Sequence, residues 1–451
     1  MTAVLLSDHP LIAVAGAIGL LLVLILWLRW QAFVALLVSS LVFAVAVGMP
    51  VDEIPASIVG GMGGALGLVA TLVGLGAVFG AMLEHSGGAR ALANWMIRLT
   101  GPKGAPWALM VAGFLISIPV FLDTALVILC PLLFALARSQ RKPAFYFGLP
   151  LLAGLAVTHS FVPPTPGPII VAEYLGVSLG PVILAGIVCG LPGAILAGPL
   201  FAKWIVPRLK LGVPEPIEDE EEAPADRTMA WITLTLILAP IALILAASLA
   251  DLKLGSENRG AWHAALAFVG HPIVALVLST LASMAVMTFR MKANRQAIQE
   301  MATKALGPAG IIILVTGAGG VFKQILVDSG AGRKLAESMS ALPIGYVALA
   351  WLLTAVIRVS QGSATVAMTA GAALMAPLVE NADLSPMRLA LLVAAIAAGA
   401  TTASHVNDSG FWMISRYLQL TEKQTLKSWT VAETIISVVG LGMALLLWGF
   451  V

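Results

Sequence analysis

The chain has 451 residues, of which 59% are hydrophobic and only 11% are charged, whereas roughly a quarter of the residues of a soluble protein are charged. Its 25 basic and 23 acidic side chains are too few to cover the roughly three soluble domains that this length would suggest. The composition therefore excludes soluble multidomain enzymes, coiled coils and disordered proteins, and a net charge of +2 is too small to indicate nucleic-acid binding. We expect an all-α polytopic membrane protein embedded in a lipid bilayer.

Apolar segments follow one another along the chain, and each is long enough, or nearly so, for a crossing of about 20 residues. They lie at 11–28, 32–49, 57–84, 104–137, 143–160, 180–203, 229–250, 264–289, 305–327, 343–380, 386–404 and 428–451. Segments 104–137 and 343–380 are too long for one crossing, and each carries a breaker near its middle, Pro119 in the first and Arg358-to-Ser363 in the second. We therefore expect about ten transmembrane helices and two re-entrant hairpins.

Two further helices are expected to be interrupted by polar residues. The first, at about 143–176, contains the proline-rich stretch 159–168, and the second, at about 386–420, contains the polar stretch 404–410. Three prolines close together forbid a continuous helix, and irregular backbone at membrane depth survives only inside protein or beside a water-filled cavity. All these breaks therefore predict a polar interior site.

The two halves of the chain repeat one another. With a shift of 243 positions, residues 78–96 align with 321–339, and nine of nineteen residues are identical. The overlong segments and the polar interruptions then also correspond, and internal duplication with interrupted helices is typical of secondary transporters. We therefore divide the chain into repeat 1 at 1–206, an acidic linker at 207–228 and repeat 2 at 229–451.

The distribution of Lys and Arg predicts the orientation, because cytoplasmic loops carry an excess of basic residues. The basic clusters face the cytoplasm if both termini are periplasmic and if 104–137 enters and leaves the membrane on the cytoplasmic side. By the same count 343–380 enters from outside, so the repeats are inverted and the linker is cytoplasmic. Arg333 and Lys334 are the main misfit, and they lie on an amphipathic stretch at 331–341, where long basic side chains can reach the interface.

The sequence contains no motif for a metal or a nucleotide, so we expect no cofactor and no metal site. Cys130 and Cys189, the only cysteines, lie inside apolar runs and are interpreted as packing residues. Glycines are frequent in the third segment, and we expect them to allow close helix packing. These glycines are Gly61, Gly63, Gly64, Gly67, Gly74, Gly76 and Gly80.

The four breaks predict one substrate site near the middle of the membrane, provided that the inverted symmetry brings them together. Half-helix N-termini would present free N–H groups and a partial positive charge there, which suit a carboxylate. Hydroxyl and amide groups nearby suit a polyhydroxylated or zwitterionic solute. The residues that we expect to bind substrate are Asp123, Thr124, His159, Ser160, Thr165, Gly167, Ser360, Gln361, Gly362, Ser363, Thr365, Asn407, Asp408 and Ser409.

Titratable residues at the breaks are the candidates for proton coupling. A carboxylate inside the membrane is costly and is a functional-site hypothesis by default, which applies to Asp123 and Asp408. His159 and His405 are the imidazole candidates. The alternatives are structural, because each carboxylate could cap a following helix and each histidine could be a hydrogen-bonded packing residue. Arg358 could bind a substrate carboxylate or form a structural pair with an acidic residue.

Two other classes of function remain open from the residues alone. Broken helices also build the filters of channels, although a duplicated pair of hairpins favours alternating access. A membrane-embedded enzyme would use His159 or His405 with Asp123 or Asp408. No HExxH, GxSxG or comparable catalytic set is present, so we expect that the protein is not an enzyme.

Four separated stretches resemble the signature stretches of the gluconate permease family, which belongs to the ion transporter superfamily. They are 159–168, 322–330, 358–365 and 404–412, and the resemblance covers essentially the whole chain. It implies proton symport of gluconate or a related sugar acid across the bacterial inner membrane, with another small carboxylate such as D-serine as the alternative. It also implies that the hairpins and interrupted helices form the site and move as an elevator against a scaffold, and a homodimer is among the expectations.

The topology can be tested at the two ends of the first hairpin. Because Lys103 and Arg138 flank 104–137 on what we expect to be the cytoplasmic side, cysteines introduced at these positions should be labelled by an impermeant reagent from the same face. The two native cysteines, interpreted as packing residues, provide the background. Labelling from opposite faces would contradict the inverted-repeat topology.

Overall fold

The computed structural model describes residues 10–215, 226–254, 261–330, 345–380 and 382–451, and all secondary structure within them is helical. Apolar runs fold into helices in lipid because a helix satisfies its backbone N–H and C=O groups within the segment. Eight helical stretches in the described part are long and apolar enough to cross a membrane, and several others are apolar but shorter. The expectation of an all-α, multi-pass membrane protein is confirmed.

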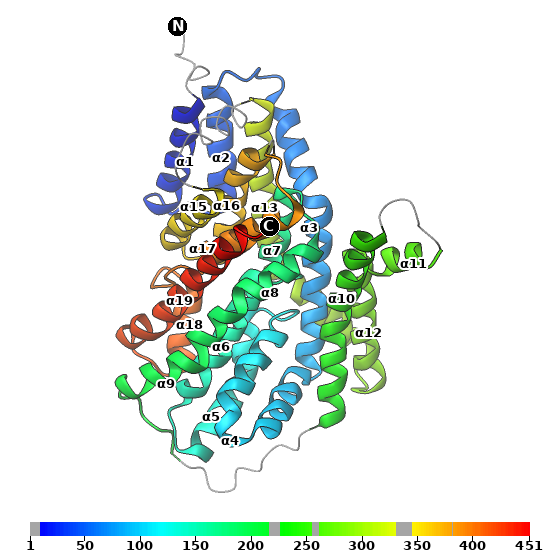
Figure 1. The fold of residues 1–451 in the computed structure, drawn as a ribbon, viewed down its shortest axis with the longest axis vertical. Helices are drawn as coiled ribbons and strands as arrows, with labels where there is room; N and C mark the ends of the chain where they lie inside the picture. The colour runs from blue at the N-terminus through cyan, green and yellow to red at the C-terminus, as the bar shows by residue number, and fades with distance from the viewer. Residues whose placement is uncertain (1–9, 216–225, 255–260, 331–344, 381) are drawn as a thin grey trace.

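The first half of the chain is a succession of helices whose last member continues through a π-helical turn, η2, and a 3-10 turn, η3. Their bounds are α1 Pro10–Leu26, α2 Ala32–Ala46, α3 Ile54–His85, α4 Gly88–Ile116, α5 Leu122–Gln140, α6 Ala144–Phe161, α7 Pro166–Leu175, α8 Leu179–Ile195, η2 Leu196–Leu200, α9 Phe201–Ile205 and η3 Val206–Arg208. Figure 1 shows α1 and α2 at one end of the molecule and α4 and α5 at the other.

The second half begins with α10, beyond the linker. Its described helices are α10 Arg227–Leu254, α11 Ala261–Val269, α12 Pro272–Phe289, α13 Arg295–Asp328, α15 Tyr346–Gln361, α16 Ala364–Val379, α17 Pro386–Ala400, α18 Ser409–Tyr417 and α19 Glu422–Trp448. The acidic residues of the linker and the expected amphipathic stretch 331–341 lie outside the described residues.

The helices break at the four places that the sequence marks. Residues 117–121 separate α4 from α5, 162–165 separate α6 from α7, 362–363 separate α15 from α16, and 401–408 separate α17 from α18. α4 packs against α5, and α15 packs against α16, as the two arms of a hairpin must. The opposite entry of the two hairpins and the inverted repeats remain predictions.

Three element boundaries differ from those expected. Segment 264–289 is divided between α11 and α12, because Pro272 begins a new helix, where its missing N–H is not needed. The helix that leads into the first hairpin begins well before residue 104 and is non-helical at Gly101, which has φ +68° and ψ 179°. α13 starts before its apolar part, and the side chain of Asn294 caps it by accepting a hydrogen bond from the N–H of Ala297 at 2.7 Å.

α3 and α13 pack along one another and join the two halves of the chain (Figure 1). A Cβ on Gly61 would lie 2.6 Å from the carbonyl oxygen of Gly320, and a Cβ on Gly320 would lie 2.5 Å from that of Gly61. A Cβ on Gly80 would overlap the carbonyl oxygen of Pro119. The prediction of close packing is right for Gly61 and Gly80. It is wrong for three glycines with nothing within 4 Å of an added Cβ, namely Gly63, Gly64 and Gly67.

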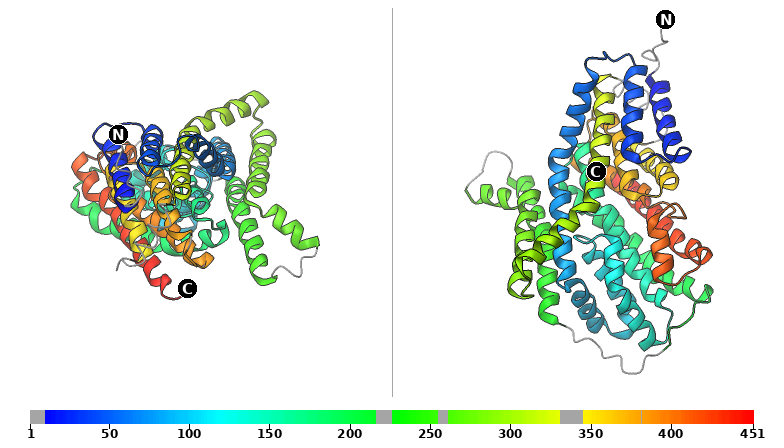
Figure 2. Two further views of the ribbon diagram at one scale, coloured as in Figure 1. Left: turned by 90° about the horizontal axis from the view of Figure 1, so that it is seen from above. Right: turned by 180° about the vertical axis from the view of Figure 1, so that it is seen from behind.

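α10, α11 and α12 stand to one side of the molecule (Figure 2). α10 packs against α4, and α12 packs against α3. Asp226 ties the start of α10 to the end of α12: it accepts a hydrogen bond from the N–H of Met229 at 2.8 Å and pairs with Arg290 at 2.8 Å. The Met229 N–H and then Arg290 hold the pKa of Asp226 below its usual value. This exposed pair lies on the face that we expect to be cytoplasmic.

We expect Gly61→Ala to destabilise the protein, because α3 and α13 must separate to admit the methyl group. Such overpacking costs about 1–3 kcal/mol. Gly63→Ala is the matched control on the same helix. It should be neutral or slightly stabilising, since Ala favours a helix over Gly by about 0.5–1 kcal/mol. Melting temperatures in one detergent measure both effects, and equal values for the two variants would contradict the close contact at Gly61.

Candidate functional site

Residues from all four broken segments line one cavity of about 590 Å³, a size typical of small-molecule sites. The cavity lies between the start of α5, the end of α6, the tip that joins α15 to α16, the start of α18, and residues of α13 and α19. Its charged and polar lining consists of Asp123, Thr124, His159, Ser160, Arg358, Gln361, Ser363, Thr365, Thr369, Asn407, Asp408, Ser409, Trp429 and Glu433. The backbone of Gly362 also lines it.

Three helices begin at this cavity, with their first residues in its wall. These residues are Leu122 of α5, Ala364 of α16 and Ser409 of α18. The first N–H groups of a helix have no partner inside the helix, and together they carry a partial positive charge. No side chain caps α5, so its first N–H groups are free of any side-chain bond. The arrangement favours a negatively charged group in the cavity.

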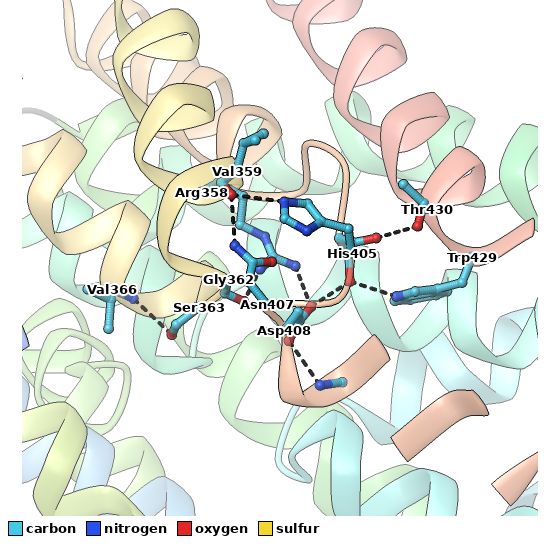
Figure 3. Close-up of polar contacts among 12 residues, drawn as sticks. Arg358, Val359, Gly362, Ser363, Val366, His405, Asn407, Asp408, Trp429 and Thr430 are labelled. Carbon is cyan, nitrogen blue, oxygen red and sulfur yellow. Dashed lines mark hydrogen bonds and ion pairs between the residues drawn. The ribbon is translucent and has the colours of Figure 1, made fainter. Parts of the chain in front are cut away.

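A buried ion pair joins the α15–α16 tip to the α17–α18 break (Figure 3). Arg358 is 4% exposed, and its Nη2 lies 2.6 Å from Oδ2 of Asp408. Arg358 also donates from Nη1 to the carbonyl of Gly362, while its Nε is buried and has no partner within the described residues. Asp408 caps α18 by accepting a hydrogen bond from the N–H of Gly410 at 2.9 Å. Both structural alternatives, a pair for Arg358 and a cap for Asp408, are therefore present in the cavity wall.

The same two segments are held together through their backbones. The carbonyl of Val359 accepts a hydrogen bond from Nδ2 of Asn407 at 2.7 Å and lies 2.9 Å from Nε2 of His405. Gly362 has φ +84°, and a Cβ there would overlap the carbonyl of Asn407. Only glycine satisfies both the left-handed backbone and the close approach. The tip is thus fixed against the second break before any ligand binds.

Ser404 connects this pair to α19. Its Oγ donates to Oδ2 of Asp408 at 2.5 Å and accepts a hydrogen bond from Nε1 of Trp429 at 2.9 Å. Its carbonyl accepts a hydrogen bond from the hydroxyl of Thr430. A continuous chain of hydrogen bonds therefore runs from α19 through Ser404 and Asp408 to Arg358 (Figure 3).

The first half of the chain contributes Asp123 and His159. Asp123 lies in the first turn of α5, is exposed, lines the cavity and makes no hydrogen bond or ion pair within the described residues. The residue at the cap position is Phe121, so the alternative that Asp123 caps this helix is wrong. His159 lines the cavity, and its Nδ1 is buried without a partner in the described part of the chain.

Three of the expected substrate-binding residues lie away from this cavity. Thr165 lines a small neighbouring pocket, and its hydroxyl donates to a carbonyl of its own interruption at 2.7 Å. Gly167 allows α7 to pack on α16, because a Cβ there would lie 2.5 Å from Sδ of Met368. Ser360 donates at 2.6 Å to a carbonyl one turn back in α15. His405, a proton-coupling candidate, also lies outside the cavity, beside the Val359 carbonyl.

α19 contributes a carboxylate that the sequence analysis missed. Glu433 is 4% exposed, lines the cavity and makes no hydrogen bond or ion pair within the described residues. A signal for it existed, since Glu433 is an acidic residue inside the last apolar segment, 428–451, where a carboxylate is costly. That segment contains no helix breaker, whereas the residues expected to form the site all lie at the broken segments.

Known proteins match this chain along almost its whole length. The sequence profile of the family described as "GntP family permease" matches residues 9–451. The "Gluconate permease" of Bacillus subtilis (strain 168) is 37% identical over 447 residues, which cover 97% of this chain and 99% of that protein. The "Low-affinity gluconate transporter" of Escherichia coli (strain K12) is 36% identical over 425 residues, covering 94% of this chain and 95% of that one.

A solved structure has a similar arrangement of helices. The Alcanivorax borkumensis YdaH transporter superposes with a TM-score of 0.65 at 18% sequence identity, covering 89% of this chain and 90% of that one. At this identity the likeness shows the fold alone.

We expect Asp408→Ala to be strongly destabilising, because it leaves the buried guanidinium of Arg358 without its counter-charge. Removing one partner of a buried pair costs about 3–5 kcal/mol. The double variant Arg358→Leu/Asp408→Ala removes both charges and should recover part of the lost stability. Melting temperatures of the wild type, both single variants and the double variant test this, and additive losses would show that the pair does not contribute as a unit.

Proposed function

We propose that this chain, which belongs to the GntP permease family, is a secondary transporter that imports gluconate or a related small sugar acid by proton symport across the bacterial inner membrane. As a member of that family it is a multi-pass membrane permease and not an enzyme. The names of its relatives support gluconate as the substrate. The structural observation that carries the proposal is a buried guanidinium in a cavity where three helices begin.

Arg358 retains donors for a ligand after its structural contacts are made. Its guanidinium has five N–H groups, and its contacts with Gly362 and Asp408 engage one N–H each on Nη1 and Nη2. Nε is buried without a partner in the described part of the protein. A substrate carboxylate placed beside Nε would receive a charge-assisted hydrogen bond, and the N-terminus of α5, which no side chain caps, would add to the attraction.

The rest of the polar lining suits the hydroxyl groups of a sugar acid. Oε1 of Gln361 is buried without a partner within the described residues, so a ligand hydroxyl that donates to it would satisfy a group that is otherwise costly to bury. Thr124 and Ser160 place further hydroxyls in the cavity wall. These groups can both donate and accept, as a polyol requires.

We propose that the site is exposed alternately to the two sides by an elevator-type movement. The wall contributed by α13 consists of Pro308, Ile311, Ile312 and Val315, whose side chains offer no hydrogen bonds to a ligand. The polar groups come instead from the two tips, α6, α18 and α19. This division supports a movement of the broken helices, together with the ligand, relative to the apolar wall of α13. The two inverted repeats and the periplasmic termini remain part of the proposal.

A zwitterionic carboxylate such as D-serine is the second candidate substrate, and Asp123 favours it. This carboxylate is exposed and unpaired within the described residues, so it could pair with the ammonium group of an amino acid whose carboxylate lies at Arg358. Competition between D-serine and labelled gluconate for uptake distinguishes the two. Complete inhibition by D-serine at lower concentration than by gluconate itself would favour the amino acid.

We expect uptake of gluconate into proteoliposomes to be driven by an inward proton gradient in sodium-free buffer. A protonophore should abolish accumulation, because the gradient is the source of energy. An absolute requirement for sodium would contradict the proton coupling. Uptake that only equilibrates and never saturates would instead indicate a channel, and a chemically altered product would indicate an enzyme.

A further inference from the structure

We propose that Glu433 carries the coupled proton, and that its protonation decides whether Arg358 can hold an anionic substrate. The inference rests on the proton symport proposed above. It assigns the coupling to a residue of the unbroken helix α19, whereas the candidates visible in the sequence, Asp123, His159, His405 and Asp408, belong to the broken segments.

The carboxylates of the cavity differ in their partners. Asp408 pairs with Arg358 and accepts hydrogen bonds from the Ser404 hydroxyl and the Gly410 N–H. Asp123 has no partner in the described part of the chain, but it is exposed. Glu433 is both 4% exposed and without a partner there. A buried carboxylate that accepts no hydrogen bond is costly as an anion and much less costly as a neutral acid. Protonation therefore stabilises Glu433 more than it stabilises Asp123 or Asp408.

Several elements bring titratable or charged groups to the surroundings of Glu433. Arg358 and Asp408 are near enough to act on it electrostatically, and His159 of α6 and Asp123 of α5 line the same cavity. The other elements packed against α19, besides α6 and α15, are α8, η2, α17 and α18. Their titratable or charged side chains are Cys189, Arg388, Arg416 and Tyr417. Arg388 is engaged elsewhere, since it donates to the carbonyl of Val451 at 2.6 Å.

The charge balance of the site explains why the proton and the substrate would bind together. Arg358 carries one positive charge, and Asp408 already balances it. An ionised Glu433 adds a negative charge that competes for the same guanidinium, and an anionic substrate would add a second one in a region of low dielectric. Protonation of Glu433 removes that competition. One proton therefore accompanies each monovalent anion, which couples uptake of the substrate to the proton gradient.

The test is the pH dependence of gluconate binding to the purified full-length protein, measured by calorimetry between about pH 5 and pH 9. If binding requires a protonated Glu433, the affinity of the wild type should be flat at low pH and should fall about tenfold per pH unit above a midpoint. Glu433→Gln mimics the protonated acid. It should bind gluconate with an affinity that does not change with pH, exchange gluconate across vesicle membranes, and fail to accumulate it from a proton gradient.

Glu84→Gln is the matched control. Glu84 lies near the end of α3, is half-buried and lies outside the cavity, so its variant should keep the pH slope of the wild type. A slope that survives in Glu433→Gln would overturn the inference while leaving the symport intact, and loss of the slope in His159→Gln or Asp123→Asn instead would transfer the role to that residue. Failure of the wild type to bind gluconate or to need a proton gradient would overturn the proposed function, and the inference with it.

A second measurement needs no variant and covers the case in which Glu433→Gln does not fold. Gluconate added to the wild type in weak buffer above the midpoint pH should draw one proton from solution per site, recorded with an indicator dye. Infrared difference spectra should show a new protonated-carboxyl band in the bound state. Binding without proton uptake at every pH, or proton uptake without that band, would contradict the role of Glu433.

Discussion

A guanidinium that is 4% exposed needs a counter-charge, and in this protein that requirement joins two segments fifty residues apart. Several contacts on the polar side of the cavity are made through the pair of Arg358 and Asp408. Asp408 also caps α18, and Ser404 connects the pair to α19. A single buried charge thus fixes the start of α18, the α15–α16 tip and α19 relative to one another.

Such an arrangement is pre-organised for the anionic substrate that we propose. Arg358 is held by the backbone carbonyl of Gly362 and by Asp408, a capping carboxylate that accepts a hydrogen bond from Ser404. A ligand that binds here need not order the site first, so less of its binding energy is lost to conformational entropy. The described residues of the cavity also include three carboxylates, those of Asp123, Asp408 and Glu433, against one guanidinium, and this excess is the basis of the proposed proton coupling.

Much of the fold was predictable because its signals are local. Prolines, glycines and polar residues inside apolar runs mark the four breaks by their backbone chemistry alone, and the structure has breaks at each of them. The direction in which a side chain faces was harder to predict, because it depends on a packing neighbour that is distant in the sequence. Gly167 thus packs on Met368 rather than lining the cavity. The pairing of Arg358 with Asp408 is a contact across fifty residues, and Glu433 was missed because its helix carries no break.

The wall from Pro308 to Val315 makes one side of the cavity apolar, whereas the other side is polar. A transporter must control both which molecule it binds and how fast the site changes sides, and the two sides of the cavity can serve these properties separately. In the proposed mechanism, the groups that recognise the ligand lie on the broken helices and α19, whereas this wall offers only shape and hydrophobic surface. Substitutions on the polar side should therefore alter which molecule is selected, and substitutions along the wall should alter how quickly the site changes sides. Substitutions in the wall can therefore change the turnover rate during evolution while the specificity is kept. Substitutions on the polar side can change the substrate while the movement of the site is kept.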